Sequence, residues 1–234
     1  MPYKEAPEAI VKRLPVYLRT LDNMLNREEE IVSSRQLSQE TGFSPEQIRK
    51  DLAFFGAFGT RGSGYEIALL RDKIIRIIGL HRKNNIVLVG AGQLGTALAR
   101  YTITKNPYVE LVGIFDQDPE VIGKEIMERQ IKELAELPQV VSRFQVKVAM
   151  LTVPAEVAQE VVDYLAWTGV NAILNFAPVS LRVPAGIHLQ NVDLTLELQS
   201  LIYYVSSEDR DLQRLVAHEE EQELRGEGEP RSKE

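Results

Sequence analysis

Residues 86–95 read Ile-Val-Leu-Val-Gly-Ala-Gly-Gln-Leu-Gly, an apolar run followed by three glycines in the spacing G-x-G-x-x-G. The apolar run predicts a buried strand, and the glycines predict a turn into a helix that begins near Gln93. Gly90 allows the tight turn, Gly92 lets the backbone approach a pyrophosphate, and Gly95 lets helix and strand pack closely. The helix N-terminus presents unpaired N–H groups to phosphates. The stretch therefore predicts an α/β sheet that binds a dinucleotide.

The composition is that of a soluble chain with a sizeable core. The chain has 234 residues, 44% of them hydrophobic, and no cysteine. It can therefore hold no disulfide, no thiolate metal site and no cysteine nucleophile. The apolar runs are only strand-sized and no signal pattern precedes them, so we expect a cytoplasmic protein with no membrane segment.

The charge is unevenly distributed along the chain. The net charge is −7, but residues 1–85 carry 14 Lys and Arg against 11 Asp and Glu. A locally basic segment in an acidic chain is compatible with binding to nucleic acid. The tail 206–234 is strongly acidic and is expected to be partly disordered.

Apolar residues recur with a helical period over residues 8–25, although Pro15 interrupts this predicted N-terminal helix. Two short predicted helices follow it. Residues 35–41 follow a serine cap and end at a glycine, and residues 44–55 begin with Ser44 as cap and Gln47 at the capping-box position. This is the helix-turn-helix pattern, whose second helix reads the major groove. We expect DNA contacts from four of its residues: Ser44, Gln47, Arg49 and Lys50. The alternative is a small helical bundle whose polar face is merely solvated.

Residues 56–65 contain four glycines and predict a β-hairpin, or wing, after the second helix. Arg61 and Gly62 lie near its tip, where an arginine between small residues suits the narrow minor groove. A flexible connecting loop is the alternative. Helix-turn-helix and wing together predict a winged helix that binds double-stranded DNA.

Asp116 ends the next predicted strand, residues 109–116, and lies 21 residues beyond Gly95. An acidic side chain there can accept both hydroxyls of the adenosine ribose and would repel a 2′-phosphate, so NAD(H) is favoured over NADP(H). Ligands of such sheets lie at the carboxyl ends of strands. The expected cofactor contacts are therefore Gly90, Ala91, Gly92, Gln93, Leu94, Gly95, Asp116, Thr152, Val153, Pro154, Asn175, Phe176, Ala177 and Pro178.

The sequence offers no catalytic residue or metal site that we can assign. Tyr101 and Lys105, four apart on the predicted helix 93–105, resemble a Tyr/Lys pair but fit one helix face equally well. Residues 81–205 suffice for the nucleotide fold alone, and no segment remains for a substrate domain. A DNA-binding sensor that is not an enzyme is favoured; a small NAD-dependent oxidoreductase and a plain NAD-binding module are the alternatives.

The chain resembles the Rex family of redox-sensing transcriptional repressors from about residue 7 to 205. The resemblance is carried by short motifs along both halves of the chain. They are Ile48-Arg-Lys-Asp-Leu, Phe55-Gly-x-x-Gly-Thr-Arg-Gly-x-Gly-Tyr65, Gly90-Ala-Gly-Gln-Leu-Gly95, Phe115-Asp-x-Asp-Pro119, Leu151-Thr-Val-Pro154, Gly169-Val-x-x-Ile-Leu-Asn-Phe-Ala-Pro178 and Asn191-Val-Asp193. Residues 124–143 differ, since they look unlike the glycine-containing hairpin of the family.

The resemblance implies a homodimer that binds an inverted-repeat operator and is released when NADH binds. It implies a C-terminal helix, over residues 193–205, that crosses to the other subunit. It also implies a switch relay in which Asp193 of the partner subunit exchanges between Tyr101 and Arg19. Tyr101 approaches the nicotinamide in this relay and is therefore the fifteenth expected cofactor contact.

The expected fold class is thus α/β, with an N-terminal winged helix, a Rossmann-type doubly wound parallel sheet and a domain-swapped C-terminal helix. The expected boundaries are 1–80 for the DNA-binding domain (helix-turn-helix within about 16–56, wing about 57–66), 81–192 for the NAD(H)-binding domain, 193–205 for the swapped helix and 206–234 for the tail.

Overall fold

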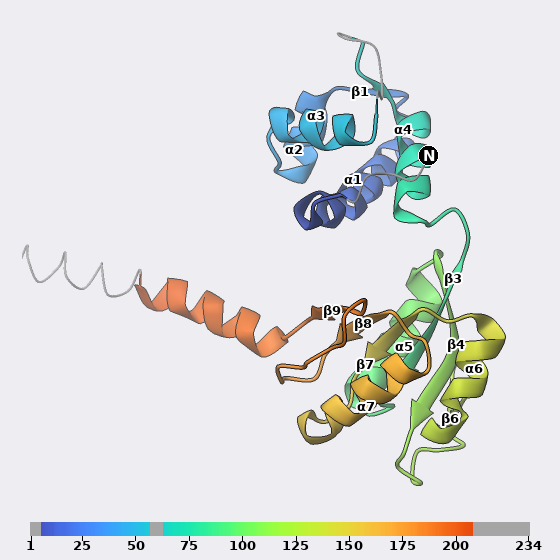
Figure 1. The fold of residues 1–234 in the computed structure, drawn as a ribbon. Coiled ribbons are helices and arrows are strands. Elements are labelled where there is room, and N and C mark those ends of the chain that lie inside the picture. Colours follow the sequence, from blue (N-terminus) through green and yellow to red (C-terminus); the bar gives the residue numbers. More distant parts are fainter. Residues whose placement is uncertain (1–5, 57–62, 208–234) are drawn as a thin grey trace, which may run out of the picture. The chain divides into compact units, whose positions relative to one another are not determined.

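A computed structural model describes residues 6–56 and 63–207 of the chain. The chain divides into two compact units (Figure 1). One, here called the N-terminal unit, comprises Met1–Asn84 with Thr102–Glu110; the other, the sheet unit, comprises Asn85–Tyr101 with Leu111–Glu234.

The N-terminal unit is helical, with one short two-stranded sheet. Its described elements are α1 (Glu8–Asn26), β1 (Ile31–Val32), α2 (Ser34–Thr41), α3 (Pro45–Phe54), β2 (Tyr65–Glu66) and α4 (Ile67–Ile78). Leucine and isoleucine side chains spaced three and four apart on the helices meet in a common core. The helix α1 runs through Pro15 as one element, so the predicted interruption does not end it.

Helices α2 and α3 form the predicted pair, joined at Gly42, which takes the left-handed conformation with φ of 76°. The capping box, however, forms at Ser33 and Gln36 of α2 rather than at Ser44 and Gln47 of α3. Ser44 does accept from the backbone N–H of Gln47, but the Gln47 side chain donates to Asp51 instead. The hydrogen bond to the buried Asp51 carboxylate holds the Gln47 side chain away from the Ser44 backbone N–H, so the expected capping box is not closed at Gln47.

The predicted wing is described only at its end. Tyr65 and Glu66 form β2, which pairs antiparallel with β1, a strand that the sequence analysis did not anticipate. Residues 57–62, with Arg61 and Gly62, lie outside the described residues.

The sheet unit contains a sheet of seven described strands in the order β5-β6-β4-β3-β7-β8-β9. The pairs β4–β6, β3–β7, β7–β8 and β8–β9 are parallel, and β5 pairs antiparallel with β6 at the edge. Leaving out β5, the order is that of the doubly wound dinucleotide fold, and the predicted Rossmann-type sheet is confirmed. The strands are β3 (Asn84–Val89), β4 (Val109–Asp116), β5 (Glu125–Ile126), β6 (Arg129–Glu133), β7 (Val148–Leu151), β8 (Ala172–Asn175) and β9 (His188–Asn191).

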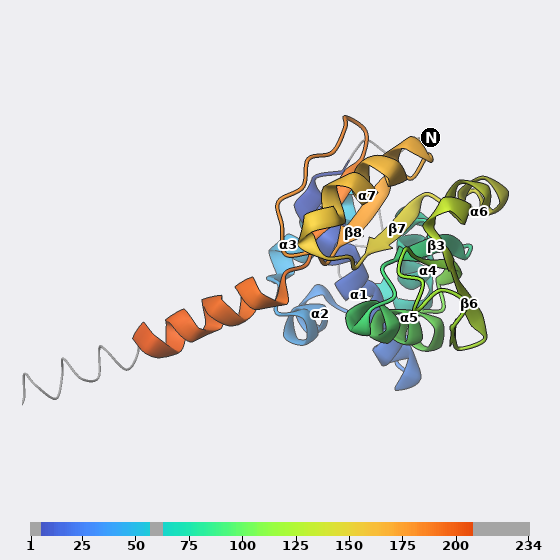
Figure 2. The ribbon, with the colours of Figure 1, turned by 90° about the horizontal axis from the view of Figure 1, so that it is seen from below.

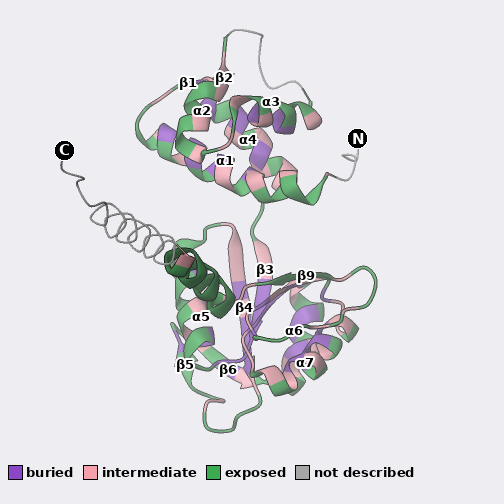
Figure 3. Ribbon diagram, turned by 90° about the vertical axis from the view of Figure 1, so that its left-hand side faces the viewer, coloured by how far each residue is buried: buried purple, intermediate pink, exposed green. Residues whose placement is uncertain are grey.

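Helices cover both faces of this sheet. Figure 3 shows α5 (Gln93–Lys105) on one side of β3 and β4, with α6 (Leu137–Phe144) and α7 (Ala155–Trp167) on the other. The two views in Figures 1 and 2 both place α7 beside β7 and β8. The main core lies between the sheet and these two helices, and a 3-10 turn (η1, Leu134–Glu136) leads into α6.

Residues 124–143 contain a β-hairpin, which was not predicted from the sequence. Strands β5 and β6 are joined by Met127 and Glu128, which both have positive φ (48° and 64°) without being glycine. The hairpin was missed because its turn lacks the usual Asn-Gly or Asp-Gly signal.

The chain continues from β9 into a helix over residues 194–207, which extends away from the sheet in Figures 1 and 2. The Asp193 carboxylate caps it by accepting from the N–H groups of Thr195 (2.9 Å) and Leu196 (3.2 Å). Its large apolar side chains are each about 60% exposed: Leu194, Leu196, Leu198, Leu201, Ile202, Tyr203, Tyr204 and Val205. No helix within the described ranges is long and apolar enough to cross a membrane.

Candidate functional site

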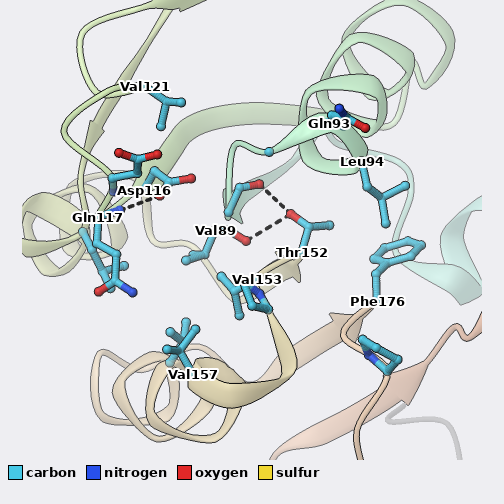
Figure 4. Close-up of a pocket in the computed structure, with 17 residues that line it drawn as sticks. Val89, Gln93, Leu94, Asp116, Gln117, Val121, Thr152, Val153, Val157 and Phe176 are labelled. Atoms are coloured by element: carbon cyan, nitrogen blue, oxygen red, sulfur yellow. Dashed lines mark hydrogen bonds between the residues drawn. The ribbon is translucent and has the colours of Figure 1, made fainter.

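A hollow of about 570 Å³ lies at the carboxyl ends of β3, β4, β7 and β8. In Figure 4, Asp116, Gln117 and Val121 stand on one side of it and Leu94 and Phe176 on the other, with Val153 between. The lining residues are Val89, Gly90, Gly92, Gln93, Leu94, Asp116, Gln117, Asp118, Val121, Leu134, Thr152, Val153, Pro154, Val157, Val161, Phe176 and Pro178.

The glycine loop has the shape that its spacing requires. Gly90 has φ of 99°, and a Cβ on Gly95 would lie 1.9 Å from the Gly90 carbonyl oxygen, so no other residue fits there. A Cβ on Gly92 would meet no atom within 4 Å. Space at Gly92, between two sterically closed glycines, is what a phosphate needs to reach the N-terminus of α5.

Side chains from neighbouring strands fix this loop. The Thr152 hydroxyl donates to the carbonyl oxygens of Gly90 (2.6 Å) and Val89 (3.1 Å), as Figure 4 shows. Asp116 Oδ2 accepts from the Ala91 N–H (2.6 Å), and its Oδ1 accepts from those of Gln117 and Asp118. Because a carboxylate oxygen has more than one acceptor site, Asp116 can still accept ribose hydroxyls while holding the loop.

Ten of the predicted cofactor contacts line the hollow, and five do not. Ala91 and Ala177 are buried, and Gly95 packs against Gly90. Asn175 is also buried: its side chain donates to Asn191 Oδ1 (2.9 Å) and accepts from the Ala177 N–H, which holds the turn after β8. Tyr101 is 65% exposed on α5 and is not among the lining residues.

Sequence reasoning missed seven lining residues. Gln117 and Asp118 follow Asp116 directly, and Val157 and Val161 lie four apart on α7, so strand end and helix period could have identified them. The remaining three are Val89, Val121 and Leu134, of which the last two flank the unrecognised hairpin.

Helix α3, the second helix of the predicted helix-turn-helix, presents a polar face. Arg49 donates to the Ser34 hydroxyl (2.9 Å), and Lys50 pairs with Glu46 (2.9 Å) with both side chains 70% exposed. Gln47 is half-buried and donates to Asp51. Asp51 lies in the Ile48-Arg-Lys-Asp-Leu motif, but no role for it was predicted from the sequence.

Asp51 is fully buried and is the centre of a network between α1 and α3. It accepts two hydrogen bonds from Arg13 (2.6 and 2.8 Å), one from the Tyr17 hydroxyl (2.7 Å) and one from Gln47 (2.7 Å). Burial raises the pKa of the Asp51 carboxyl, but these donors and the charge of Arg13 outweigh burial and hold that pKa below its usual 3.8. Burial and the neighbouring Asp51 raise the pKa of Tyr17, so its hydroxyl stays a donor.

The three predicted relay residues belong to two different units. Arg19 is exposed on α1, Tyr101 is exposed on α5, and Asp193 caps the helix 194–207. No group of three His, Cys, Asp or Glu suited to a metal ion occurs within residues 6–56 and 63–207.

Comparison with known proteins identifies both halves of the chain. A family model described as a putative DNA-binding protein N-terminus matches residues 5–53, and one described as a CoA binding domain matches residues 81–179. The redox-sensing transcriptional repressor Rex of Natranaerobius thermophilus is 54% identical over 204 residues, which are 87% of this chain and 93% of that protein. The chain belongs to the Rex family of redox-sensing transcriptional repressors.

Other Rex proteins also match this chain over most of its length. The Rex repressor of Carboxydothermus hydrogenoformans is 42% identical, covering 85% of this chain and 96% of that one. Among solved structures, RSP, a Rex-family repressor, matches with a TM-score of 0.79 and 33% identity over 90% of this chain and 99% of its own. RSP in complex with β-NAD+ and operator DNA matches with a TM-score of 0.80 and 34% identity over 97% of this chain and 100% of its own. RSP has also been solved with β-NADH. The predicted family, the DNA-binding N-terminal unit and the parallel sheet are confirmed.

Proposed function

We propose that this Rex protein is a homodimeric repressor that binds inverted-repeat operator DNA and leaves it when NADH binds. One observation carries the proposal: an open glycine-loop pocket and a helix-turn-helix occur together in a chain whose whole length resembles RSP, which was solved with operator DNA and with both redox forms of the cofactor. We assign DNA binding to residues 1–80 and NAD(H) binding to residues 81–192.

The pocket suits a dinucleotide bound across the sheet. Asp116 and Gln117 would hold the adenosine ribose, and the loop around Gly92 would hold the pyrophosphate. The far side, with Leu94, Phe176 and Pro178, is apolar and would receive the nicotinamide. Oxidised nicotinamide carries a positive charge that is costly to bury there without compensation, so this side favours NADH over NAD+.

For DNA we assign the polar face of α3, with Gln47, Arg49 and Lys50 facing the major groove and Ser44 at the phosphate backbone. Arg61 and Gly62 are assigned to the minor groove on sequence grounds. Two such helices in a symmetric dimer require two half-sites related as an inverted repeat.

The dimer is assigned to the helix over 194–207. Eight large apolar side chains at about 60% exposure are more than an isolated helix tolerates in water, and a second copy of the chain supplies a cover for them. In that dimer Asp193 of the partner subunit would exchange between Tyr101 and Arg19.

Release by NADH requires differential binding. NADH can lower DNA affinity only if it binds the DNA-free conformation more tightly, and DNA must then weaken NADH binding by the same factor. Couplings of this kind are about 1–3 kcal/mol, or about 5- to 150-fold. We propose that the cofactor acts only as an allosteric ligand, that the chain is not an enzyme, and that it works in the cytoplasm beside the DNA it regulates.

The test is a fluorescence-anisotropy titration of the full chain on an inverted-repeat operator. NADH at micromolar concentration should release the DNA, and NAD+ at the same concentration should release far less. An intact complex at saturating NADH would falsify the proposal. Substrate-dependent consumption of NADH, abolished by Tyr101→Phe, would instead support the alternative of a small oxidoreductase.

A further inference from the structure

The network around Asp51 also determines how one DNA-contacting side chain is oriented. Gln47 and Asp51 lie four residues apart on α3, and Gln47 Nε2 is 2.7 Å from Asp51 Oδ1. Arg13 and Tyr17 occupy the rest of the carboxylate, with two bonds to Oδ2 and one to Oδ1. Asp51 is completely buried, so the carboxylate cannot turn to another partner in water.

A carboxylate held charged can only accept hydrogen bonds. The Gln47 amide must therefore turn its nitrogen toward Asp51, which directs Oε1 the other way. Gln47 Oε1 accepts no hydrogen bond from a described residue, and no buried side-chain oxygen or nitrogen in the described residues lacks a partner. Oε1 is consequently open to solvent on the recognition helix.

An acceptor held in this position distinguishes between bases. In the major groove adenine and cytosine present donors, their N6 and N4 amino groups, whereas guanine presents O6 and N7 and thymine presents O4, which are acceptors. A free glutamine adapts to either kind by rotating its amide, at a cost in side-chain entropy. An amide held by a buried carboxylate does not rotate, so the orientation of the Gln47 amide is fixed before the protein binds DNA.

We propose that Asp51 is a positioning residue for base recognition: it fixes the Gln47 amide so that Gln47 selects adenine or cytosine at one position of each half-site. The inference rests on the proposed contact between Gln47 and the operator. Asp51 touches no base itself and acts through Gln47.

The experiment selects operators from a randomised double-stranded inverted-repeat library with the full chain in the absence of NADH. The wild type should select adenine or cytosine at one position of each half-site, and guanine or thymine there should weaken binding about 5- to 10-fold, the value of one hydrogen bond. Gln47→Ala should erase this preference. Asp51→Asn replaces the carboxylate by an amide that both donates and accepts, so Gln47 can turn over and the preference should fall below about 2-fold.

The double variant separates positioning from stability. If Asp51 acts through Gln47, adding Asp51→Asn to Gln47→Ala changes the selectivity at that position no further. Ile48→Val, a buried neighbour on the same helix, is the matched control and should leave the selected sequence unchanged.

Two outcomes overturn the inference alone: an Asp51→Asn profile identical to that of the wild type, or one in which affinity falls equally at all positions. If the wild type selects no sequence at all, the proposed operator binding itself is overturned. This outcome differs from a failure of the inference about Asp51, because it is seen with the wild type before any variant is compared.

Discussion

Two aspartates organise the two functional regions, each by accepting hydrogen bonds on both oxygens. Asp51 holds α1 and α3 together through Arg13, Tyr17 and Gln47. Asp116 holds the glycine loop through the Ala91 N–H and its own turn through Gln117. Both carboxylates are structural in this sense, and Asp116 also lines the hollow at the strand ends.

Asp51 should make the stability of the N-terminal unit depend on acid pH. Its pKa is lowered in the folded state, so its contribution is fully present above the unfolded value of about 3.8 and is lost as the pH falls through the lower folded value. Urea unfolding followed by circular dichroism should show the wild type losing its advantage over Asp51→Asn below about pH 4.

The magnitude at neutral pH is a separate check on the network. Asp51→Ala leaves Arg13 with no carboxylate partner and should lower the free energy of unfolding by about 3 kcal/mol. An advantage of the wild type that stayed constant down to pH 3, or a loss below about 1 kcal/mol for the alanine variant, would contradict this account of Asp51.

Asp116→Ala should weaken NADH binding without weakening operator binding. The substitution removes the acceptor proposed for the ribose hydroxyls and also the bond to the Ala91 N–H. Hydrogen bonds to a charged group contribute about 1.5–3 kcal/mol, so we expect NADH affinity to fall about 10- to 100-fold in isothermal titration calorimetry.

Arg61→Ala is the reciprocal variant. It should weaken operator binding by about 5- to 10-fold at low salt and leave NADH affinity unchanged, because an arginine offered to the minor groove contributes to DNA binding alone. If both variants lost both ligands, misfolding rather than a lost contact would be the cause.

For individual residues, the sequence predicts those features that depend on the local geometry of the backbone. The glycine spacing alone predicts the roles of Gly90 and Gly95, because a Cβ at either position would clash with neighbouring atoms. Asp51 could not be found, because its donors on α1 lie 34 and 38 residues earlier in the chain and no local pattern links them. Asn175 was predicted to be a cofactor contact, but its side chain donates to the Ala177 carbonyl oxygen and to Asn191 Oδ1. Asn191 lies 16 residues further along the chain on β9, so no local pattern links it to Asn175.

Among the elements, the hairpin β5–β6 is the least expected. It places β6 beside β4, where Leu134 and Val121 on either side of the hairpin line the pocket. Helix α5 and strand β4, by contrast, have the bounds that the sequence predicts, because proline, glycine and the apolar period mark their ends. The hairpin has no such mark, since Met127 and Glu128 occupy a turn that favours Asn-Gly.

Replacing Met127 and Glu128 by Asn and Gly should therefore stabilise the protein. Side chains at positive φ cost about 1–2 kcal/mol per residue, part of which the replacement recovers. For a chain of this size we expect the melting temperature to rise by about 2–4 °C in a thermal scan.

Gly123→Ala is the matched opposite change. Gly123 precedes the same hairpin with φ of 85°, so an alanine there introduces strain and should lower the melting temperature. A double variant at 127 and 128 that melts at or below the wild-type temperature would show that the turn is not strained.

At the scale of the molecule, the proposed function depends on contacts that a single chain does not contain. The family resemblance is the only source for the relay of Arg19, Tyr101 and Asp193. Within one chain Asp193 caps a helix and Arg19 is an exposed helix residue, as expected without the resemblance. No residue pattern within one subunit can predict a pairing that would form only between two subunits.

The helix over 194–207 is expected to join two subunits in the assembled protein. If its apolar side chains are covered by a second copy, Leu198→Glu with Leu201→Glu places charge in that interface and should dissociate the dimer in sedimentation-velocity experiments. Operator binding should fall by more than 100-fold, because a monomer holds one half-site and loses the gain from joining the two. NADH affinity should fall less, since the pocket residues all come from one sheet unit.

Glu197→Gln, on the same helix but polar already, should leave the dimer intact. A variant that stays dimeric and binds the operator normally would show that another surface joins the subunits, and the exposed apolar face would then need a different partner.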